Sequence, residues 1–292
     1  MAIDKLQDKI RKLKNPVLVD FSAGPDQIPP HIAQQERDYI HAYGRFCTEL
    51  LEALAGKVPG VRFSFSSFAV LGTEGLTLLS WLLDQAKKQG FYVVLDMPEA
   101  LSSLHAAHMS QSVFSLGSLW QCDGILTSAY IGSDALKPYA AQLKDSEKDL
   151  FVVLRTANRT ASELQELLTG GRLVYMALAD QLNRLGVSLT GRGGYSRVAA
   201  VGSASSADCL RNLRGKYNSM FLLLDGADYP NANIKNCSAA FDKFGHGAVA
   251  CVGLSVTAAW RSEDSDGTDF AECACRSVER IKKNFARYIT IL

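Results

Sequence analysis

Charged side chains that could carry out acid–base or anion chemistry stand near the ends of several short apolar runs. Asp96 and Glu99 follow one run, Arg62 lies within another, and Asp225 and Asp228 follow a third. A carboxyl group can transfer a proton or hydrogen-bond a backbone N–H, so Asp96 is either a catalytic acid or a structural residue, and we favour the structural interpretation. Arg62 can bind an anion or pair with Asp96. We favour the pairing, because buried charges are normally compensated.

Motifs for metal, cofactor or nucleophile chemistry are weak in this sequence. His105 and His108 have a spacing compatible with a metal site, but no H-E-x-x-H motif accompanies them, and solvated or packed histidines are favoured. Cys273 and Cys275 form a C-A-C pair without a second pair of ligands. The sequence contains no P-loop, no G-x-G-x-x-G opening a helix and no G-x-S-x-G. We therefore predict no metal and no cofactor.

The hydrophobic pattern predicts the scaffold that positions these side chains. Eight apolar runs have the length of buried parallel strands: 17–21, 61–66, 91–95, 124–127, 150–154, 198–201, 220–224 and 248–252. Segments with helical spacing lie between them: 31–54, 74–88, 135–143, 173–185, 206–214 and 234–244. No Pro/Gly-rich linker divides the series, so the pattern favours an α/β fold, a single (β/α)8 TIM barrel over residues 1–292. A doubly wound open sheet is the alternative.

Three further segments complete the predicted organisation. Residues 3–14 form an amphipathic charged helix rather than a signal peptide, because no apolar segment follows the basic residues. This helix and a last helix over residues 269–288 are expected to pack outside the barrel. Residues 188–195 are Gly-rich and form either a lid or a plain connector, of which the connector is favoured.

Composition excludes several classes of protein. The 292 residues include 31 basic and 30 acidic side chains, a net charge of +1, which argues against nucleic-acid binding. A hydrophobic content of 47% and a charged content of 21% exclude a disordered chain. Residues 100–122 lack charge but are rich in serine, so we predict no membrane span. Seven scattered cysteines suit reduced thiols and a cytoplasmic location.

In a TIM barrel, chemistry belongs to the carboxyl ends of the strands, and there the sequence resembles a known family. The landmarks are NPVLVDFSAGPDQIPP, FAVLGTEGL, FYVVLD, DGILTSAYIGSDALKPY and LFVVLRTAN. Along nearly its whole length the chain resembles the bacterial long-type (group 2) orotidine 5′-phosphate decarboxylases. The resemblance implies conversion of orotidine monophosphate to UMP and CO2 in pyrimidine biosynthesis, without metal or cofactor. It also implies a homodimer formed through the barrel mouth.

The family's catalytic motif, D-x-K-x-x-D on strand three, is incomplete in this sequence. Asp96 matches the first Asp, whereas Pro98 replaces the lysine and Leu101 replaces the second Asp. Proline has no ionisable group, so Pro98 cannot supply the proton that the reaction requires. The resemblance also implies that the second Asp reaches into the partner's site in the dimer, and Leu101 cannot act there as an acid. The strand-two lysine of the family falls on Arg62.

The ligand-binding positions that the resemblance implies have also changed. The strand-one Asp that holds the ribose falls on Ser22, and the Asn-Pro of strand four falls on Ser128 and Ala129. After strand five the family residues Arg155, Thr156 and Asn158 are kept, but a serine is replaced by Ala157. The phosphate loop becomes Asp225-Gly226-Ala227-Asp228, and the phosphate-binding arginine falls on Val256.

Three hypotheses follow for the function. The predicted site has a net charge of −2, which opposes binding of a phosphate dianion. Four acidic residues and two arginines contribute to this charge: Asp96, Glu99, Asp225, Asp228, Arg62 and Arg155. We therefore favour a decarboxylase-like protein that is non-catalytic or altered in function. The alternatives are a working decarboxylase with re-recruited residues and a barrel enzyme for another small molecule.

Overall fold

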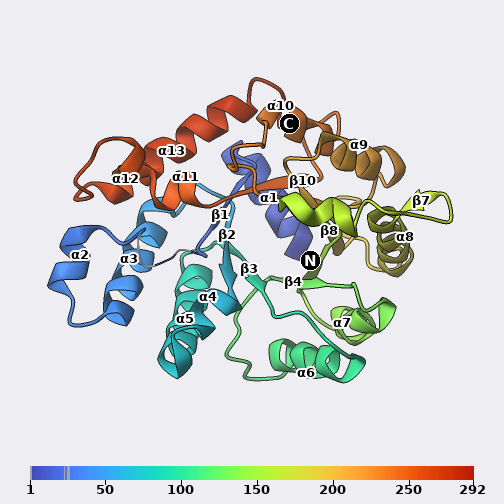
Figure 1. Ribbon diagram of the computed structural model, residues 1–292, viewed down its shortest axis with the longest axis horizontal. Helices are drawn as coiled ribbons and strands as arrows, with labels where there is room; N and C mark the ends of the chain where they lie inside the picture. Colours follow the sequence, from blue (N-terminus) through green and yellow to red (C-terminus); the bar gives the residue numbers. More distant parts are fainter. Residues whose placement is uncertain (1, 23, 25–26) are drawn as a thin grey trace.

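The computed structural model describes residues 2–22, 24 and 27–292 and contains a closed barrel of eight parallel strands (Figure 1). Around the barrel the order is β1 (Val17–Asp20), β10 (Ala248–Val252), β9 (Leu222–Asp225), β8 (Val198–Ser203), β5 (Asp149–Val153), β4 (Gly124–Ser128), β3 (Tyr92–Asp96) and β2 (Gly60–Ser64), which pairs again with β1. Each predicted apolar run overlaps one of these strands. The (β/α)8 prediction is confirmed, and the open sheet is wrong because β1 and β2 pair and close the ring.

Helices surround the barrel wall on its outer side (Figure 1). The longer ones are α3 (Tyr39–Leu54), α5 (Gly72–Lys88), α6 (Ser103–Phe114), α7 (Lys137–Leu143), α8 (Val174–Gly186), α9 (Ala207–Lys216) and α13 (Phe270–Phe285). The short ones are α2 (Pro30–Gln35), α4 (Phe65–Ala69), α10 (Ile234–Cys237), α11 (Leu254–Thr257) and α12 (Ala259–Ser262). Single turns of 3-10 helix, η2 (Ser133–Ala135), η3 (Arg159–Glu163) and η4 (Ser238–Ala240), and a hairpin of β6 (Leu168–Thr169) and β7 (Arg172–Leu173) fill the connections.

Two predicted helices differ from the structure. The segment 31–54 is divided, because the backbone of Glu36 is extended and Asp38 starts α3 by accepting a hydrogen bond from the N–H of His41. The segment 234–244 is helical only as far as Ala240, because Phe241 takes an extended conformation. In the part of the chain that the structure describes, no helix is long and apolar enough to cross a membrane.

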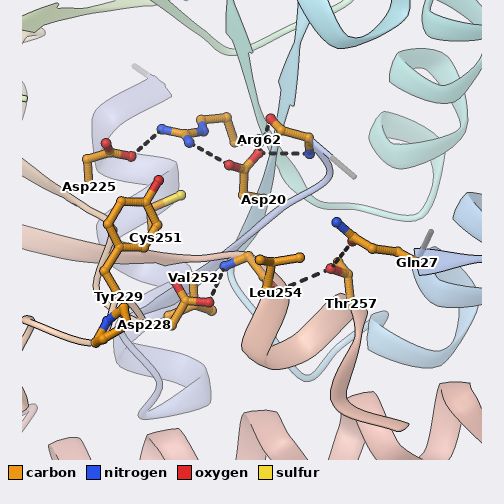
Figure 2. A pocket seen from close by; sticks show the side chains of 14 residues that line it. Asp20, Gln27, Arg62, Asp225, Asp228, Tyr229, Cys251, Val252, Leu254 and Thr257 are labelled. Atoms are coloured by element: carbon orange, nitrogen blue, oxygen red, sulfur yellow. Dashed lines mark hydrogen bonds and ion pairs between the residues drawn. The ribbon is translucent and has the colours of Figure 1, made fainter. Parts of the chain in front are cut away.

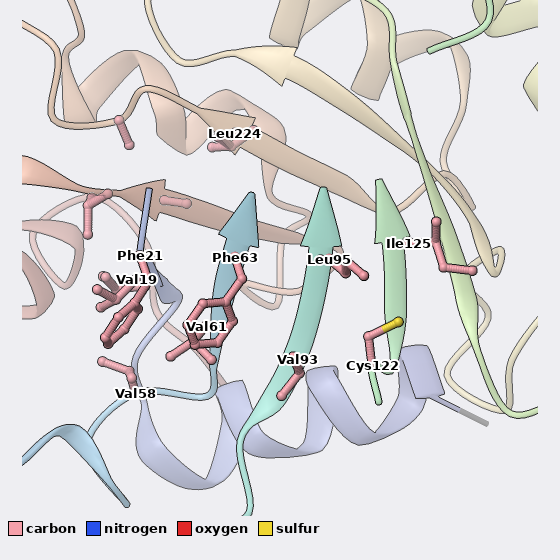
Figure 3. Packing of buried hydrophobic residues seen from close by; sticks show 14 of the residues in the cluster. Val19, Phe21, Val58, Val61, Phe63, Val93, Leu95, Cys122, Ile125 and Leu224 are labelled. Carbon is pink, nitrogen blue, oxygen red and sulfur yellow. The ribbon is translucent and has the colours of Figure 1, made fainter. Parts of the chain in front are cut away.

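Alternation along each strand divides the core into two layers. Val17, Val19, Val61 and Phe63 belong to the layer between strands and helices, part of which Figure 3 shows. The intervening Leu18 belongs to a second cluster, which also contains Tyr92, Val94, Leu126, Phe151, Ala199, Val201, Phe221, Leu223, Val249 and Cys251. These residues fill the barrel itself, as expected when side chains alternate in direction. The same alternation directs the last residues of β1, β3 and β9 (Asp20, Asp96 and Asp225) toward the barrel axis, because each lies two residues after an inward-facing one.

The N-terminal helix α1 (Ala2–Leu13) closes one end of the barrel. Its apolar residues Ala2, Ile3, Leu6 and Ile10 are buried in the same cluster as the barrel interior. We predicted that this helix packs outside with the C-terminal helix. The prediction is wrong for α1, which runs beneath the amino ends of the strands (Figure 3), because its apolar face covers side chains that would otherwise meet water. The C-terminal helix α13 packs on the wall against α3 and α11.

The Gly-rich segment 188–195 also lies at the amino end. Asp4 of α1 accepts hydrogen bonds from the N–H groups of Arg192 (3.2 Å) and Gly193 (2.9 Å). Because this segment leads into β8, it is at the opposite end of the barrel from the mouth. The lid interpretation is therefore wrong, and the segment is a connector.

We expect Ile3→Val to lower the free energy of unfolding by about 0.5–1.5 kcal/mol, since it removes one methylene from a side chain that is 1% exposed. Urea denaturation measures the change. Val187→Ala is the control for an exposed position, because Val187 is 72% exposed just after α8, and it should change stability by less than about 0.5 kcal/mol. Equal effects of the two substitutions would mean that α1 does not contribute to the barrel core.

Candidate functional site

Four charged residues come together at the carboxyl end of the barrel. Asp20 ends β1, Arg62 lies in β2, Asp96 ends β3 and Asp225 ends β9. Asp20, Asp96 and Asp225 each lie two residues after an inward-facing residue of the same strand, and Arg62 is paired with Asp20 on the neighbouring strand. All four side chains therefore point toward the barrel axis. This end, which is the catalytic end in barrel enzymes, therefore carries three carboxylates around one guanidinium.

Arg62 is held between two of these carboxylates. Its Nη2 lies 2.5 Å from Asp20 Oδ2 and its Nη1 lies 2.7 Å from Asp225 Oδ1 (Figure 2). Burial alone would lower the pKa of Arg62, but the charges of Asp20 and Asp225 outweigh it and raise the pKa well above its ordinary value. The predicted pairing of Arg62 with Asp96 is wrong, because Asp20 and Asp225 take both terminal nitrogens.

Asp96 is left without a compensating partner. Among the described residues, none forms a hydrogen bond or an ion pair with its carboxylate, so the expected bond to a backbone N–H is wrong as well. Burial raises the pKa of Asp96 to about 6, the attraction of Arg62 lowers it, and Asp20 and Asp225 raise it further. A carboxyl group in this state can exchange a proton near neutral pH.

An open pocket of about 420 Å³ lies beside the Arg62 network (Figure 2). Its lining comes from β1, β2 and the loops after β9 and β10: Asp20, Ser22, Gln27, Arg62, Asp225, Gly226, Asp228, Tyr229, Pro230, Cys251, Val252, Gly253, Leu254 and Thr257. The pocket is part of the barrel mouth, where ligands of this fold bind.

The Asp228 carboxylate accepts hydrogen bonds from backbone N–H groups just after β10, the eighth strand of the barrel. Its Oδ2 accepts hydrogen bonds from the N–H of Gly253 (2.9 Å) and of Ser255 (3.0 Å). In TIM barrels, phosphate often binds between the loops after strands seven and eight, at the start of a short extra helix. Here β9 and β10 are those strands and α11 is that helix. The carboxylate of Asp228 thus takes N–H groups that a phosphate would need.

The predicted ligand-binding residues divide into two groups. Ser22, Asp225, Gly226 and Asp228 line the pocket. The other four, Ser128, Arg155, Thr156 and Asn158, are absent from its lining. Ser128 is buried, and its Oγ accepts the N–H of Tyr130 at 3.5 Å.

Arg155, Thr156 and Asn158 form hydrogen bonds with residues of the loop that follows β5. Arg155 Nε donates to Glu166 at 3.0 Å, and the N–H of Thr156 donates to Gln165 Oε1 at 2.8 Å. Asn158 bonds to Thr156 and donates to Thr160. These contacts favour the interpretation that the segment holds the loop in place.

Sequence reasoning missed Asp20, Gln27, Tyr229 and Thr257. Asp20 was detectable, because the alternation that places Leu18 inside the barrel also turns Asp20 inward at the end of β1. Ser22 lies beyond the strand, and both its N–H (3.1 Å) and its Oγ (2.7 Å) donate to Asp20 Oδ1. The other three reach the pocket through loops and a short helix, for which the sequence has no periodic signal.

The described residues form no evident metal site. Among the described residues, no group of three or more His, Cys, Asp or Glu side chains is placed to hold a metal ion. His105 and His108 are both exposed on α6.

Together, the closed barrel and the charged mouth define a (β/α)8 protein with a ligand-sized pocket at its carboxyl end. No protein-family model matches the chain. The orotidine 5′-phosphate decarboxylase of Clostridium novyi (strain NT) is 24% identical over 288 residues, which cover 98% of this chain and 99% of the relative. That of Clostridium perfringens (strain 13 / Type A) is 26% identical over 278 residues, 94% of each chain.

Solved structures of the same kind share the fold. The OMP decarboxylase of Leishmania donovani superposes with a TM-score of 0.72 at 22% identity, covering 97% of this chain and 99% of that one. The orotidine 5′-monophosphate decarboxylase of Plasmodium berghei gives a TM-score of 0.75 at 14% identity, with the same coverage of both chains. The barrel architecture is thus common to this chain and these enzymes.

Proposed function

We propose that this chain is a member of the orotidine 5′-phosphate decarboxylase family that no longer carries out the decarboxylation. Family membership is supported by full-length similarity to curated decarboxylases and by the shared barrel. Loss of the reaction is supported by the described side chains at the barrel mouth, which do not include the lysine that the reaction needs. Pro98 stands where the resemblance expects the lysine, and among the described residues lining the pocket the one cationic side chain is Arg62.

The arrangement of Asp20, Arg62 and Asp225 carries the proposal. Decarboxylation needs an ammonium group beside the carbon that loses CO2, to stabilise the developing negative charge and then donate a proton. Arg62 cannot fill this role, because a guanidinium does not release its proton in proteins and both of its terminal nitrogens are engaged. Loss of one such charged stabiliser lowers a rate by roughly three decades.

The phosphate side of the pocket supports the same conclusion. Binding energy from a distant phosphate normally helps such an enzyme reach its transition state. Here Asp228 holds the N–H groups of Gly253 and Ser255, and Val256 stands where the resemblance expects an arginine. A phosphate dianion in this place would meet a carboxylate instead of donors, which is repulsive in a partly buried site.

We expect purified protein to leave orotidine 5′-phosphate unchanged when the absorbance of the pyrimidine is followed, and to show no heat of binding with UMP. The Clostridium novyi enzyme, assayed in parallel, is the positive control. Turnover that disappears in Asp96→Asn but persists in Asp145→Asn, an exposed position, would overturn the proposal and favour a working decarboxylase. Retention of an open, ligand-sized pocket at the barrel mouth favours altered function over a purely structural role.

We also propose that the chain forms a homodimer through the barrel mouth, as the family resemblance implies. Large apolar side chains are exposed at this end, in loops and in the first turns of α6 and α11: Leu101 (76%), Leu104 (61%), Ile131 (43%), Tyr229 (48%) and Leu254 (61%). Such a concentration of exposed apolar surface is typical of an interface. The acid that the family contributes to its partner's site corresponds to Leu101, so this dimer would not complete a catalytic site.

Leu101→Arg is expected to shift the protein from dimer to monomer in sedimentation velocity, with an apparent dissociation constant weakened at least tenfold, because a charge would be buried in the interface. Leu116→Arg is the matched control, since Leu116 is fully exposed beyond the end of α6, away from the mouth. A monomeric wild type, or equal dissociation of both variants, would contradict a dimer formed at this end.

A further inference from the structure

The acidic pocket (the cavity lined by Asp20, Arg62, Asp225 and Asp228) has carboxylate oxygens that are still available. Three carboxylates and one guanidinium give these lining residues a formal net charge of −2. Arg62 donates to Asp225 Oδ1, and the two backbone N–H groups donate to Asp228 Oδ2. Within the described part of the chain, no group donates to Asp225 Oδ2 or to Asp228 Oδ1. Because both residues line the pocket, two carboxylate acceptors and an excess of negative charge are available at its wall.

Gln27 provides an independent sign of a ligand. Its side chain lines the pocket and the residue is only 7% exposed. Its Oε1 accepts a hydrogen bond from Thr257 Oγ1 at 2.7 Å, while Nε2 has no partner among the described residues. Nε2 is not one of the fully buried polar atoms and is accessible from the pocket, so it is a donor available to a ligand atom there. Figure 2 shows Gln27 and Asp225 on opposite sides of the pocket.

The walls between these polar groups are largely apolar. Of the lining residues, Tyr229, Pro230 and Leu254 are exposed, whereas Cys251 and Val252 are buried and form the inner wall. Burial raises the pKa of Cys251 well above its ordinary value, so this thiol is neutral. A ligand with a short hydrocarbon segment between two polar ends matches a pocket that has polar groups on opposite sides and apolar walls between them.

We propose that the acidic pocket binds a small cationic amino alcohol. The ammonium group pairs with the carboxylates of Asp225 and Asp228, and the hydroxyl oxygen accepts a hydrogen bond from Gln27 Nε2. The ammonium also reduces the net charge of the pocket from −2 to −1, which neither a neutral diol nor an anion can do. The inference rests on the proposed function, because it requires a mouth that no longer receives a nucleotide phosphate.

Isothermal titration calorimetry with matched probes tests the inference. We expect 4-aminobutan-1-ol, or a homologue of two to six carbons, to bind with a dissociation constant of about 1 mM. Butane-1,4-diol, which lacks the ammonium, should bind at least about tenfold more weakly, and butan-1-amine, which lacks the hydroxyl, about fivefold more weakly. Gln27→Leu should abolish the difference between amino alcohol and amine, whereas Asp208→Asn, at an exposed ion pair, should change nothing.

Three outcomes would overturn the inference: equal binding of diol and amino alcohol, an unchanged preference in Gln27→Leu, or no binding across the series. UMP titrated in the same experiment tests the proposed function separately. Absence of both UMP and amine binding would contradict only the amino-alcohol inference, whereas tight UMP binding would contradict both.

Discussion

Substitution of Arg62 by methionine is expected to lower the free energy of unfolding by about 3–5 kcal/mol, measured by urea denaturation at neutral pH. Arg62 is the shared partner of Asp20 and Asp225, and all three side chains are largely buried, with 13%, 13% and 22% exposed. Methionine fills a similar volume but has no charge. Two carboxylates would then remain in the mouth without a cation, and the desolvation of each would be uncompensated.

A triple variant separates the cost of the uncompensated carboxylates from the cost of lost packing around Arg62. Arg62→Met combined with Asp20→Asn and Asp225→Asn should recover most of the stability, because a buried ion network replaced by neutral groups is often close to neutral in free energy. Arg211→Met is the control for a surface pair, since Arg211 and Asp208 are 58% and 85% exposed, and it should cost less than about 1 kcal/mol. If the triple variant were as unstable as the single one, the carboxylates would not be the cause.

The barrel could be predicted from sequence because its strands are buried on both faces. Such strands read as continuous apolar runs, and eight runs alternating with helical segments leave few arrangements open. The length of the helix predicted at 234–244 is too great, because the apolar spacing continues past Ala240 although the helical backbone ends there. The location of α1 was missed for a different reason. An amphipathic helix shows which face is buried but not which surface covers it.

The site was less predictable than the fold, because its contacts depend on closure of the ring. Arg62 and Asp20 lie on adjacent strands, but Asp225 reaches the same guanidinium across the mouth from β9. Pairing of Arg62 with Asp96 was a reasonable expectation from neighbouring strands. It is wrong because Arg62 turns toward β1 and β9, not toward β3. The bonds of Asp228 to residues after β10 are likewise set by loop geometry rather than by spacing.

Asp96→Asn is expected to stabilise the protein by about 2–3 kcal/mol above pH 7 and to have little effect near pH 4. Burial raises the pKa of Asp96 in the folded protein to about 6, whereas an unfolded chain has a value of about 3.9. Below the unfolded pKa the carboxyl group is protonated in both states and costs nothing. Between pH 4 and pH 6 the unfolded state loses its proton first, so the folded state becomes relatively less stable as pH rises.

The measurement is a set of urea denaturation curves at several pH values for wild type and variant, which should diverge through pH 4 to 6 and then run parallel. Asp145→Asn is the matched control, because Asp145 is exposed, and its curves should follow those of wild type within about 0.5 kcal/mol. A difference that is constant with pH would show that Asp96 has no raised pKa. A variant less stable than wild type at high pH would show that the ionised carboxylate has a partner, and Asp96 would then be a structural residue with no proton to exchange near neutral pH.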